Sequence, residues 1–307
     1  MLSFLKLIPS KVSCIDLNFL GQPGVIGAYL IQNSHGNILI ESGPGSTIPA
    51  LTAGLERLGT HLSDISDLFL THIHLDHAGA VGWLAQQGIR IHVHPKGAPH
   101  LLNPEKLLSS AAKIYGTSLE DLWGKFLPVP PENLFILNDG EILEISGLKI
   151  QAIFTPGHAD HHLSFIHEGV CFTGDLAGIR LAGAGSIVLP TPPPEFHLEM
   201  WRSSVNRLAN LELTHVIPTH FGIYPNPAKH FSVVKEFLSD LETWMEIVFA
   251  SQPSRDELDQ QYTMWLMNKV KNQGIAPELL PLYESLCSPG MSASGVYRYW
   301  NKVHSRT

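Results

Sequence analysis

Hydrophobic and polar positions alternate in short runs along the first two thirds of the chain, and glycine, proline or asparagine separates the runs. Apolar residues at helical spacing over 48–59 predict a helix that ends at Gly59. Runs rich in β-branched and large apolar residues predict strands at 12–18, 25–32, 37–41 and 67–71. Strands that alternate with helices in this way predict an α/β sandwich.

The same patterns continue through the middle of the chain. Residues 132–158 alternate in polarity and contain Asp-Gly and Ser-Gly turn signals, so we predict antiparallel strands there. A second hairpin is expected around Glu168-Gly169. Further strands are predicted at 89–94 and 214–220, and further helices at 77–87, 99–123 and 197–211.

The pattern changes after about Asn226. Apolar residues then recur at helical spacing, as at Phe231, Val234 and Phe237, and they predict two longer helices followed by two shorter ones. We therefore expect an α/β domain over residues 1–227 and a helical extension over 228–307. The extension is expected either to cap a site or to form a homodimer interface.

Composition narrows the class of protein. The net charge of -8 argues against a nucleic-acid partner, which needs a basic surface. No run approaches the roughly 20 apolar residues of a membrane span. The apolar start of the chain is interrupted by Lys6 and lacks a signal-peptidase site, and the three widely spaced cysteines do not suggest disulfides. We expect a cytoplasmic protein with a small-molecule substrate.

The strongest chemical signal is the segment Thr71-His72-Ile73-His74-Leu75-Asp76-His77, which directly follows a predicted strand. Imidazole and carboxylate groups are the ligands that zinc prefers. Taken alone, the segment is also compatible with Asp76 as a helix N-cap and with exposed histidines. Three more strand-to-loop junctions end in a ligand type, namely His158, Asp175 and His220. A single histidine of this kind is usually a surface residue, but the joint occurrence predicts a metal centre.

The segments THIHLDHAG, TPGH, FTGD and PTHFG, in this order, resemble the metallo-β-lactamase-fold superfamily over about residues 12–222. The resemblance implies an αββα sandwich with two divalent metal ions at one edge, most simply zinc, with iron or manganese as alternatives. It implies His72, His74 and His158 as ligands of one ion, Asp76, His77 and His220 as ligands of the other, and Asp175 as the bridge. One departure is Glu41-Ser42-Gly43, where the family usually has Asp; we expect Glu41 to support the loop instead of binding metal.

The resemblance further implies a hydrolase in which a metal-bridging hydroxide attacks an ester, thioester, lactone or phosphoester. Asp76 would bind metal and orient the hydroxide. His162 matches a histidine that related hydrolases carry at this spacing, and the adjacent His161 competes with it for a place at the site. Tyr224 follows the loop of His220 and is a third candidate catalytic residue.

Other functions on the same fold are less well supported. A mono-iron persulfide dioxygenase would use positions such as His72, His158 and Asp175, all of which are present, so it remains the main alternative. An oxygen-reducing di-iron protein would carry Glu at the position of His74 and an attached flavin domain, neither of which is present. The negative charge opposes an RNA nuclease, and the complete set of ligands opposes a binding module without catalysis.

Overall fold

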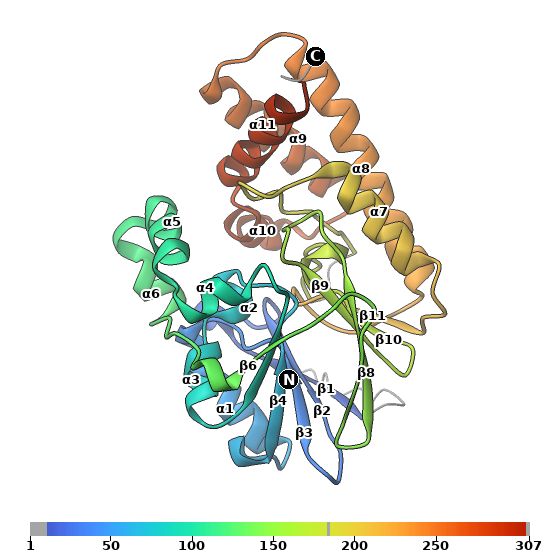
Figure 1. Cartoon of the computed structure of the whole chain (residues 1–307). Coiled ribbons are helices and arrows are strands. Elements are labelled where there is room, and N and C mark those ends of the chain that lie inside the picture. The colour runs from blue at the N-terminus through green and yellow to red at the C-terminus, as the bar shows by residue number, and fades with distance from the viewer. Residues whose placement is uncertain (1–10, 183–184, 305–307) are drawn as a thin grey trace.

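The computed structural model describes residues 11–182 and 185–304, and it confirms the predicted αββα sandwich. Two six-stranded sheets pack against each other, and helices cover their outer faces (Figure 1). The sequence predicted that the apolar segment at residues 1–10 is not a signal peptide, and this segment lies outside the described residues.

The first sheet has the strand order β1-β2-β3-β4-β5-β6. Strands β1, β2 and β3 are antiparallel neighbours, whereas β3 to β6 run parallel to one another. The parallel strands place their carboxyl ends at one edge of the sheet. The strands are β1 (Val12–Asp16), β2 (Gly27–Ile31), β3 (Asn37–Ile40), β4 (Ile65–Phe69), β5 (Arg90–Val93) and β6 (Leu134–Ile136).

The second sheet has the order β12-β11-β10-β9-β8-β7 and is antiparallel except for the pair β10 and β11. The predicted hairpin at Glu168-Gly169 is confirmed, since it joins β9 to β10. The strands are β7 (Ile142–Ile145), β8 (Leu148–Phe154), β9 (Leu163–His167), β10 (Val170–Phe172), β11 (His215–Ile217) and β12 (Tyr224–Pro225).

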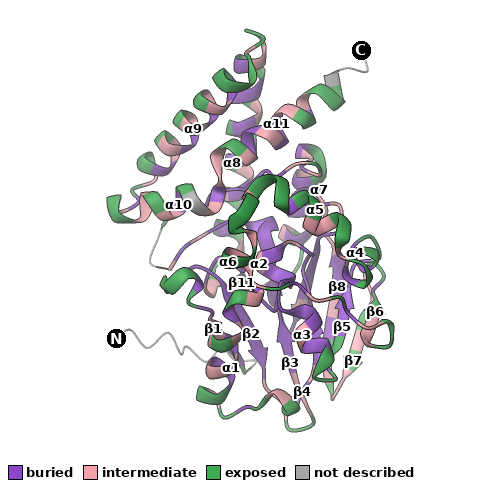
Figure 2. Ribbon diagram, turned by 90° about the vertical axis from the view of Figure 1, so that its left-hand side faces the viewer, coloured by how far each residue is buried: buried purple, intermediate pink, exposed green. Residues whose placement is uncertain are grey.

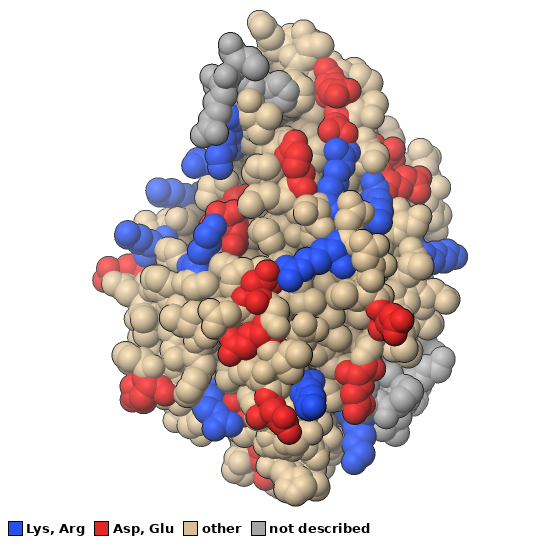
Figure 3. Space-filling model, turned by 45° about the vertical axis from the view of Figure 1, so that its right-hand side comes forward, with Lys and Arg blue, Asp and Glu red and all other residues tan. Residues whose placement is uncertain are grey.

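The helices lie outside the two sheets. None of those in the described ranges combines the length and the apolar character needed to cross a membrane. They are α1 (Ile48–Arg57), α2 (Leu75–Ala78), α3 (Val81–Gln86), α4 (Ala98–Leu102), α5 (Glu105–Tyr115), α6 (Leu119–Trp123), α7 (Leu198–Ala209), α8 (Pro227–Phe249), α9 (Arg255–Asn272), α10 (Leu280–Cys287) and α11 (Pro289–His304). On the face drawn in Figure 3, acidic and basic side chains are interspersed, and neither sign forms a continuous patch.

A buried aromatic and aliphatic layer joins the two sheets. The ring of Phe69 on β4 meets the edge of Phe165 on β9 at a centroid distance of 5.2 Å, and Tyr29 on β2 lies 5.9 Å from Phe172 on β10. All four rings are almost completely buried, and burial of one such side chain stabilises the fold by roughly 1.5–3 kcal/mol. The central strands are accordingly buried, whereas β6 and β7 and many helix and turn residues are partly or fully exposed (Figure 2).

One predicted pairing is wrong. Residues 132–158 do not form a single antiparallel unit, because β6 pairs in parallel with β5 in the first sheet, whereas β7 and β8 form a hairpin in the second. The Asp139-Gly140 turn therefore carries the chain from one sheet to the other. Asp139 fixes this crossing by accepting hydrogen bonds from the backbone N–H of Phe154 and from Arg207, each at 2.8 Å. Polarity patterns identify strands but not their partners.

Helices α8 to α11 form the C-terminal extension, and α8 begins at Pro227, at the predicted boundary. They share one continuous hydrophobic core with the sandwich. The hydroxyl of Tyr283 donates to the carbonyl of Ser186 at 2.9 Å, and Thr191 donates to the carbonyl of Ser292 at 3.0 Å. The division at residue 227 and a homodimer through these helices stay predictions.

Candidate metal centre

Four chain segments bring chemically active side chains to one edge of the sandwich, each directly after a strand. The segment after β4 carries His72 and His74 and continues into α2, which carries Asp76 and His77. The segments after β8, β10 and β11 carry His158, Asp175 and His220. Strand ends meet at this edge, so residues up to 148 positions apart in the sequence converge, as predicted.

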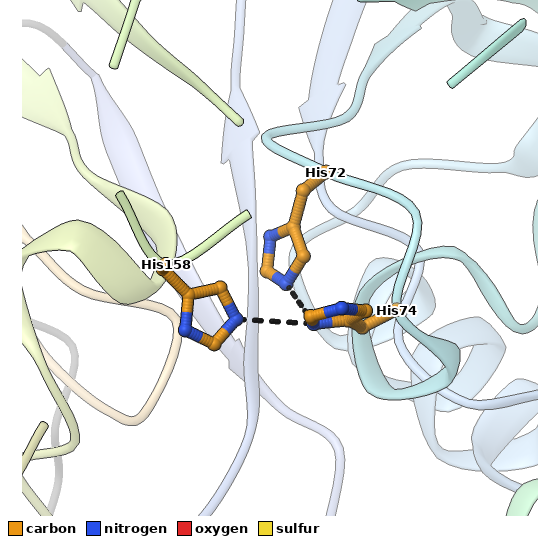
Figure 4. Close-up of side chains that lie close together, drawn as sticks. All are labelled: His72, His74 and His158. Carbon is orange, nitrogen blue, oxygen red and sulfur yellow. Dashed lines mark hydrogen bonds between the residues drawn. The ribbon is translucent and has the colours of Figure 1, made fainter. Parts of the chain in front are cut away.

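His72, His74 and His158 form the first group of ring nitrogens (Figure 4). Nδ1 of His74 lies 2.9 Å from Nε2 of His72 and 3.0 Å from Nε2 of His158. His72 and His158 are almost fully buried. Burial and the neighbouring histidines lower the pKa of His72 and bring that of His74 to about 3, so these rings are neutral at neutral pH. Neutral imidazole is the form that binds metal.

Asp76, His77 and His220 form the second group. Oδ2 of Asp76 lies 3.1 Å from Nε2 of His220 and 3.4 Å from Nε2 of His77. Burial acts to raise the pKa of Asp76, but the nearby histidines outweigh it and hold the pKa below its usual range. This group therefore combines two imidazoles with one ionised carboxylate.

Asp175 lies between the two groups. Its Oδ2 is 3.4 Å from Nε2 of His158 in the first group, and its Oδ1 is 3.3 Å from Nε2 of His77 in the second. The same carboxylate thus faces both sets, one oxygen to each. The bridging role that the sequence resemblance implied for Asp175 stays a prediction.

Hydrogen bonds on the outer side of the imidazoles fix which nitrogen is free. Nδ1 of His158 donates to the carbonyl of Pro190 and Nδ1 of His220 donates to the carbonyl of Val25, both at 3.1 Å. A carbonyl can only accept, and burial lowers the pKa of His158, so the inward Nε2 of its neutral ring carries a lone pair. Burial acts to lower the pKa of His220 as well, but Asp175 and Asp76 outweigh it and raise that pKa. Such outer partners orient metal-binding histidines in proteins.

Two buried atoms at the centre lack any hydrogen-bond partner, namely Nε2 of His77 and Oδ1 of Asp175. A buried polar atom without a partner costs free energy, and lone pairs that converge on one point repel each other unless a cation lies between them. The donor set of imidazole nitrogen and carboxylate oxygen suits divalent transition metals. By this test, the residues present fit divalent metal ions.

Glu41 connects two of the four segments that form the centre. Its buried carboxylate accepts hydrogen bonds from Nδ1 of His77 at 3.0 Å, from the hydroxyl of Thr219 at 3.0 Å, and from the hydroxyl of Thr71. Thr71 in turn accepts from Nδ1 of His72 at 3.1 Å. Glu41 thus supports ligands without itself belonging to either metal-binding group, as expected from the sequence.

The structure separates the two adjacent histidines that the sequence left in competition. His161 lines the cavity in front of the centre, and its Nε2 lies 3.2 Å from Oε2 of Glu195. His162 lies behind the centre, where its Nε2 accepts the backbone N–H of Asp175 at 3.2 Å and its Nδ1 bonds to Thr155 at 2.9 Å. This geometry makes His162 a positioning residue for Asp175, and its predicted catalytic role stays untested.

Tyr224 is not among the residues that line the cavity. Its hydroxyl donates to the carbonyl of Phe221 at 2.7 Å, and the guanidinium carbon of Arg180 lies 3.8 Å from the centre of its ring. The predicted catalytic role of Tyr224 gains no support from this position.

A cavity of about 460 Å³ opens in front of the centre, and its wall includes His74, Asp76, His158, Asp175 and His220. The side chain of Asp76 is 21% exposed and that of Asp175 is 5% exposed, so Asp76 is the more accessible carboxylate. Most of the remaining wall is apolar and comes from α5, α6, the proline-rich segment before α7, and the C-terminal helices. These wall residues include Leu107, Ala111, Ile114, Trp123, Pro190, Pro192, Leu286 and Met291.

The sequence interpretation missed this wall. It placed helices at 99–123 and noted the proline-rich loop, but polarity alone does not say that these segments face the histidines. Tyr115 is one such residue: it lines the cavity, and burial together with the charge of Asp76 raises its pKa to about 12, so its hydroxyl is neutral.

Comparison with known sequences supports the assignment of the fold. The sequence profile of the metallo-beta-lactamase superfamily matches residues 21–220. The chain is 31% identical to the atrochrysone carboxyl ACP thioesterase of Aspergillus fumigatus, over 67% of this chain and 55% of that protein. It is 30% identical to the hydroxyacylglutathione hydrolase of Pseudomonas fluorescens, over 62% of this chain and 60% of that protein. The matched part thus spans little more than half of these two relatives.

A solved structure shows that the fold continues into the C-terminal helices. The metallo-beta-lactamase family protein TTHA1429 of Thermus thermophilus superposes with a TM-score of 0.70 at 22% sequence identity. The superposition covers 97% of this chain and 95% of that one. The chain therefore belongs to the metallo-beta-lactamase superfamily, whose members named here include a hydrolase and a thioesterase.

Proposed function

We propose that this protein is a metal-dependent hydrolase that cleaves an acyl bond, with an acyl thioester as the preferred substrate class and a lactone or other ester as the next. Two divalent metal ions, most simply zinc, would be held by His72, His74 and His158 and by Asp76, His77 and His220, and Asp175 would serve both. The cytoplasm remains the proposed location.

One observation carries the proposal: seven buried or half-buried ligand groups converge, Asp175 faces a histidine of each of the two sets, and members of both sets line the cavity. Ions bound there would lower the pKa of a water molecule and polarise the acyl oxygen of a substrate. A purely structural site would be closed off from solvent instead.

The protein's own groups would orient the reactants. Asp76 is the accessible carboxylate at the cavity, so it can accept a hydrogen bond from the attacking water and direct the water's lone pair at the acyl carbon. His161 lies on the same wall, where its Nε2 faces the carboxylate of Glu195. The apolar wall excludes other water from the acyl carbon.

The apolar cavity wall and the names of two similar proteins favour a thioester over a phosphoester as substrate. A cavity dominated by apolar side chains suits an uncharged acyl group better than a charged phosphoester. Two similar proteins carry the names of a thioesterase and a hydroxyacylglutathione hydrolase, and both names denote cleavage of an acyl group from sulfur.

The test is a substrate panel with the protein after reconstitution with zinc, manganese or iron. Hexanoyl thioester, six-carbon lactone, aryl phosphoester and alkyl persulfide substrates would be compared by kcat/KM, with metal content measured on the same samples. We expect thioester turnover to rise with metal content towards two ions per chain. Turnover only of a persulfide, with one iron per chain, would instead support the sulfur dioxygenase alternative.

A further inference from the structure

We propose that the cavity is an acyl-chain pocket, and that α5 and α6 select thioesters with an acyl group of medium length over acetyl thioesters. The inference rests on the proposed function and names the substrate class that the site takes. It is carried by the placement of the apolar residues around the metal-binding groups.

Helix α5 contributes an apolar stripe to the cavity. Leu107, Ala111 and Ile114 are spaced by four and three positions, so they lie on one face of the helix, and all three line the cavity. Ile114 is 49% exposed although it is a large apolar residue. A ligand chain laid along this face would cover Ile114 and remove apolar surface from water.

The floor beside this stripe is rigid. The indole ring of Trp123 on α6 stacks on Phe19 at a centroid distance of 5.2 Å with an interplanar angle of 15°, and Tyr115 meets its edge at 5.3 Å. Ser46 donates to the carbonyl of Leu122 at 2.7 Å. A Cβ at Gly124 would lie 2.3 Å from the backbone nitrogen of Ser46, so α6 is in close contact with the sandwich.

The opposite wall is held by the C-terminal helices. Pro190 and Pro192 line the cavity on either side of Thr191, which donates to the carbonyl of Ser292 at 3.0 Å. Leu286 and Met291 complete this wall. The C-terminal extension thus closes the cavity opposite α5 and leaves an apolar space between two supported walls.

The small number of charged side chains around the cavity suits an uncharged acyl chain. Apart from Asp76 and Asp175 of the metal centre, the Asp, Glu, Lys or Arg residues on the described cavity wall are Lys106 and Glu195. A cavity of about 460 Å³ falls within the usual range for small-molecule sites, roughly 300–1,000 Å³, and exceeds what an acetyl group would fill.

The first test measures kcat/KM of the metal-loaded protein for acetyl, butyryl, hexanoyl and octanoyl thioesters of N-acetylcysteamine. Each added methylene is expected to raise kcat/KM about fourfold until the chain outgrows the cavity, as follows from roughly 0.8 kcal/mol per buried methylene. A flat profile, or one that follows the length of the thiol half instead, would overturn the inference.

Two variants test whether the acyl chain of the substrate lies against α5. Ser110 lines the cavity and is exposed, so Ser110→Phe should fill the space without disturbing the core and shift the preference from octanoyl to butyryl. Ile114→Asn should lower the ratio of the octanoyl to the acetyl kcat/KM about tenfold. Ile247→Asn, a matched control on α8 with 69% exposure, should keep the wild-type profile. If the two cavity variants also kept it, α5 would not select the acyl chain.

A binding measurement separates this inference from the proposed function. The octyl thioether of N-acetylcysteamine has no thioester carbon to attack. Calorimetry can therefore follow its binding whether or not the protein cleaves any thioester. We expect binding with a negative heat-capacity change, weakened about tenfold in Ile114→Asn but not in Ile247→Asn. Failure of every thioester to react, with this binding intact, would refute thioester cleavage and retain the apolar-chain pocket; absence of binding would refute the pocket.

Discussion

Replacement of Glu41 by glutamine tests whether the centre depends on the carboxylate behind it. Glu41 is in the left-handed region with φ 66° and directs one oxygen at His77, Thr219 and Thr71. All three are donors, and the carboxylate can accept from all of them. The glutamine side chain has nearly the same shape, but it carries no charge, and its NH₂ group can only donate.

The magnitude follows from the hydrogen bond to Nδ1 of His77 at 3.0 Å. A hydrogen bond to a charged group contributes roughly 1.5–3 kcal/mol, against roughly 0.5–1.5 kcal/mol for a neutral one. The difference, together with a less basic His77, predicts a loss of about 10- to 100-fold in metal affinity, the range found when outer partners of metal ligands are removed.

The assay is competition for zinc between the protein and a fluorescent chelator. Asp67→Asn is the matched control, because Asp67 is also a buried carboxylate that contacts a histidine, at 2.7 Å from Nε2 of His92, but it belongs to none of the metal-binding groups. Glu41→Gln should weaken zinc binding, whereas Asp67→Asn should lower the melting temperature and leave zinc affinity unchanged. Equal zinc affinity in Glu41→Gln and wild type would refute the reasoning about Glu41.

Three further predictions concern residues around the site. His162→Ala leaves the backbone N–H of Asp175 unpaired, so it should lower kcat and thermal stability by the equivalent of about 1–3 kcal/mol. The KM for a thioester should stay constant, because His162 does not line the cavity. Steady-state kinetics check kcat and KM, and calorimetry checks the stability. Tyr224→Phe should keep kcat within twofold of wild type, because its hydroxyl bonds to a backbone carbonyl; a loss of 100-fold would restore the catalytic role predicted from the sequence. Burial acts to raise the pKa of Asp67, but hydrogen bonds from His92 and Arg90 outweigh it and hold the pKa below its usual range. The stability that Asp67 contributes at neutral pH should therefore be lost as the pH falls below about 4. Asp67→Asn should flatten that part of the plot of melting temperature against pH.

The ligand positions could be predicted from the sequence because they depend on local order. Each follows a strand whose polarity pattern is clear, and the carboxyl ends of neighbouring parallel strands meet at one edge, so His72 on the loop after β4 had to lie near that edge. The role of Glu41 as a support was also accessible, since it ends β3 beside β4.

The remaining features depend on contacts between segments far apart in the chain. Strand β6 carries the same polarity signal whichever sheet it joins, so its pairing with β5 could not be predicted. His161 and His162 are adjacent, and the turn of the loop alone decides which of them faces the cavity. The apolar wall requires α5 and the C-terminal helices to lie opposite each other, which no local pattern indicates.

The most direct test of the proposed centre is the metal content of the purified protein, measured by mass spectrometry after zinc loading, together with that of Asp175→Ala. Because Asp175 faces both groups of ligands, we expect two zinc ions per chain in wild type, and at most one together with almost no turnover in the variant. Two tightly held ions and full activity in Asp175→Ala would contradict the shared centre.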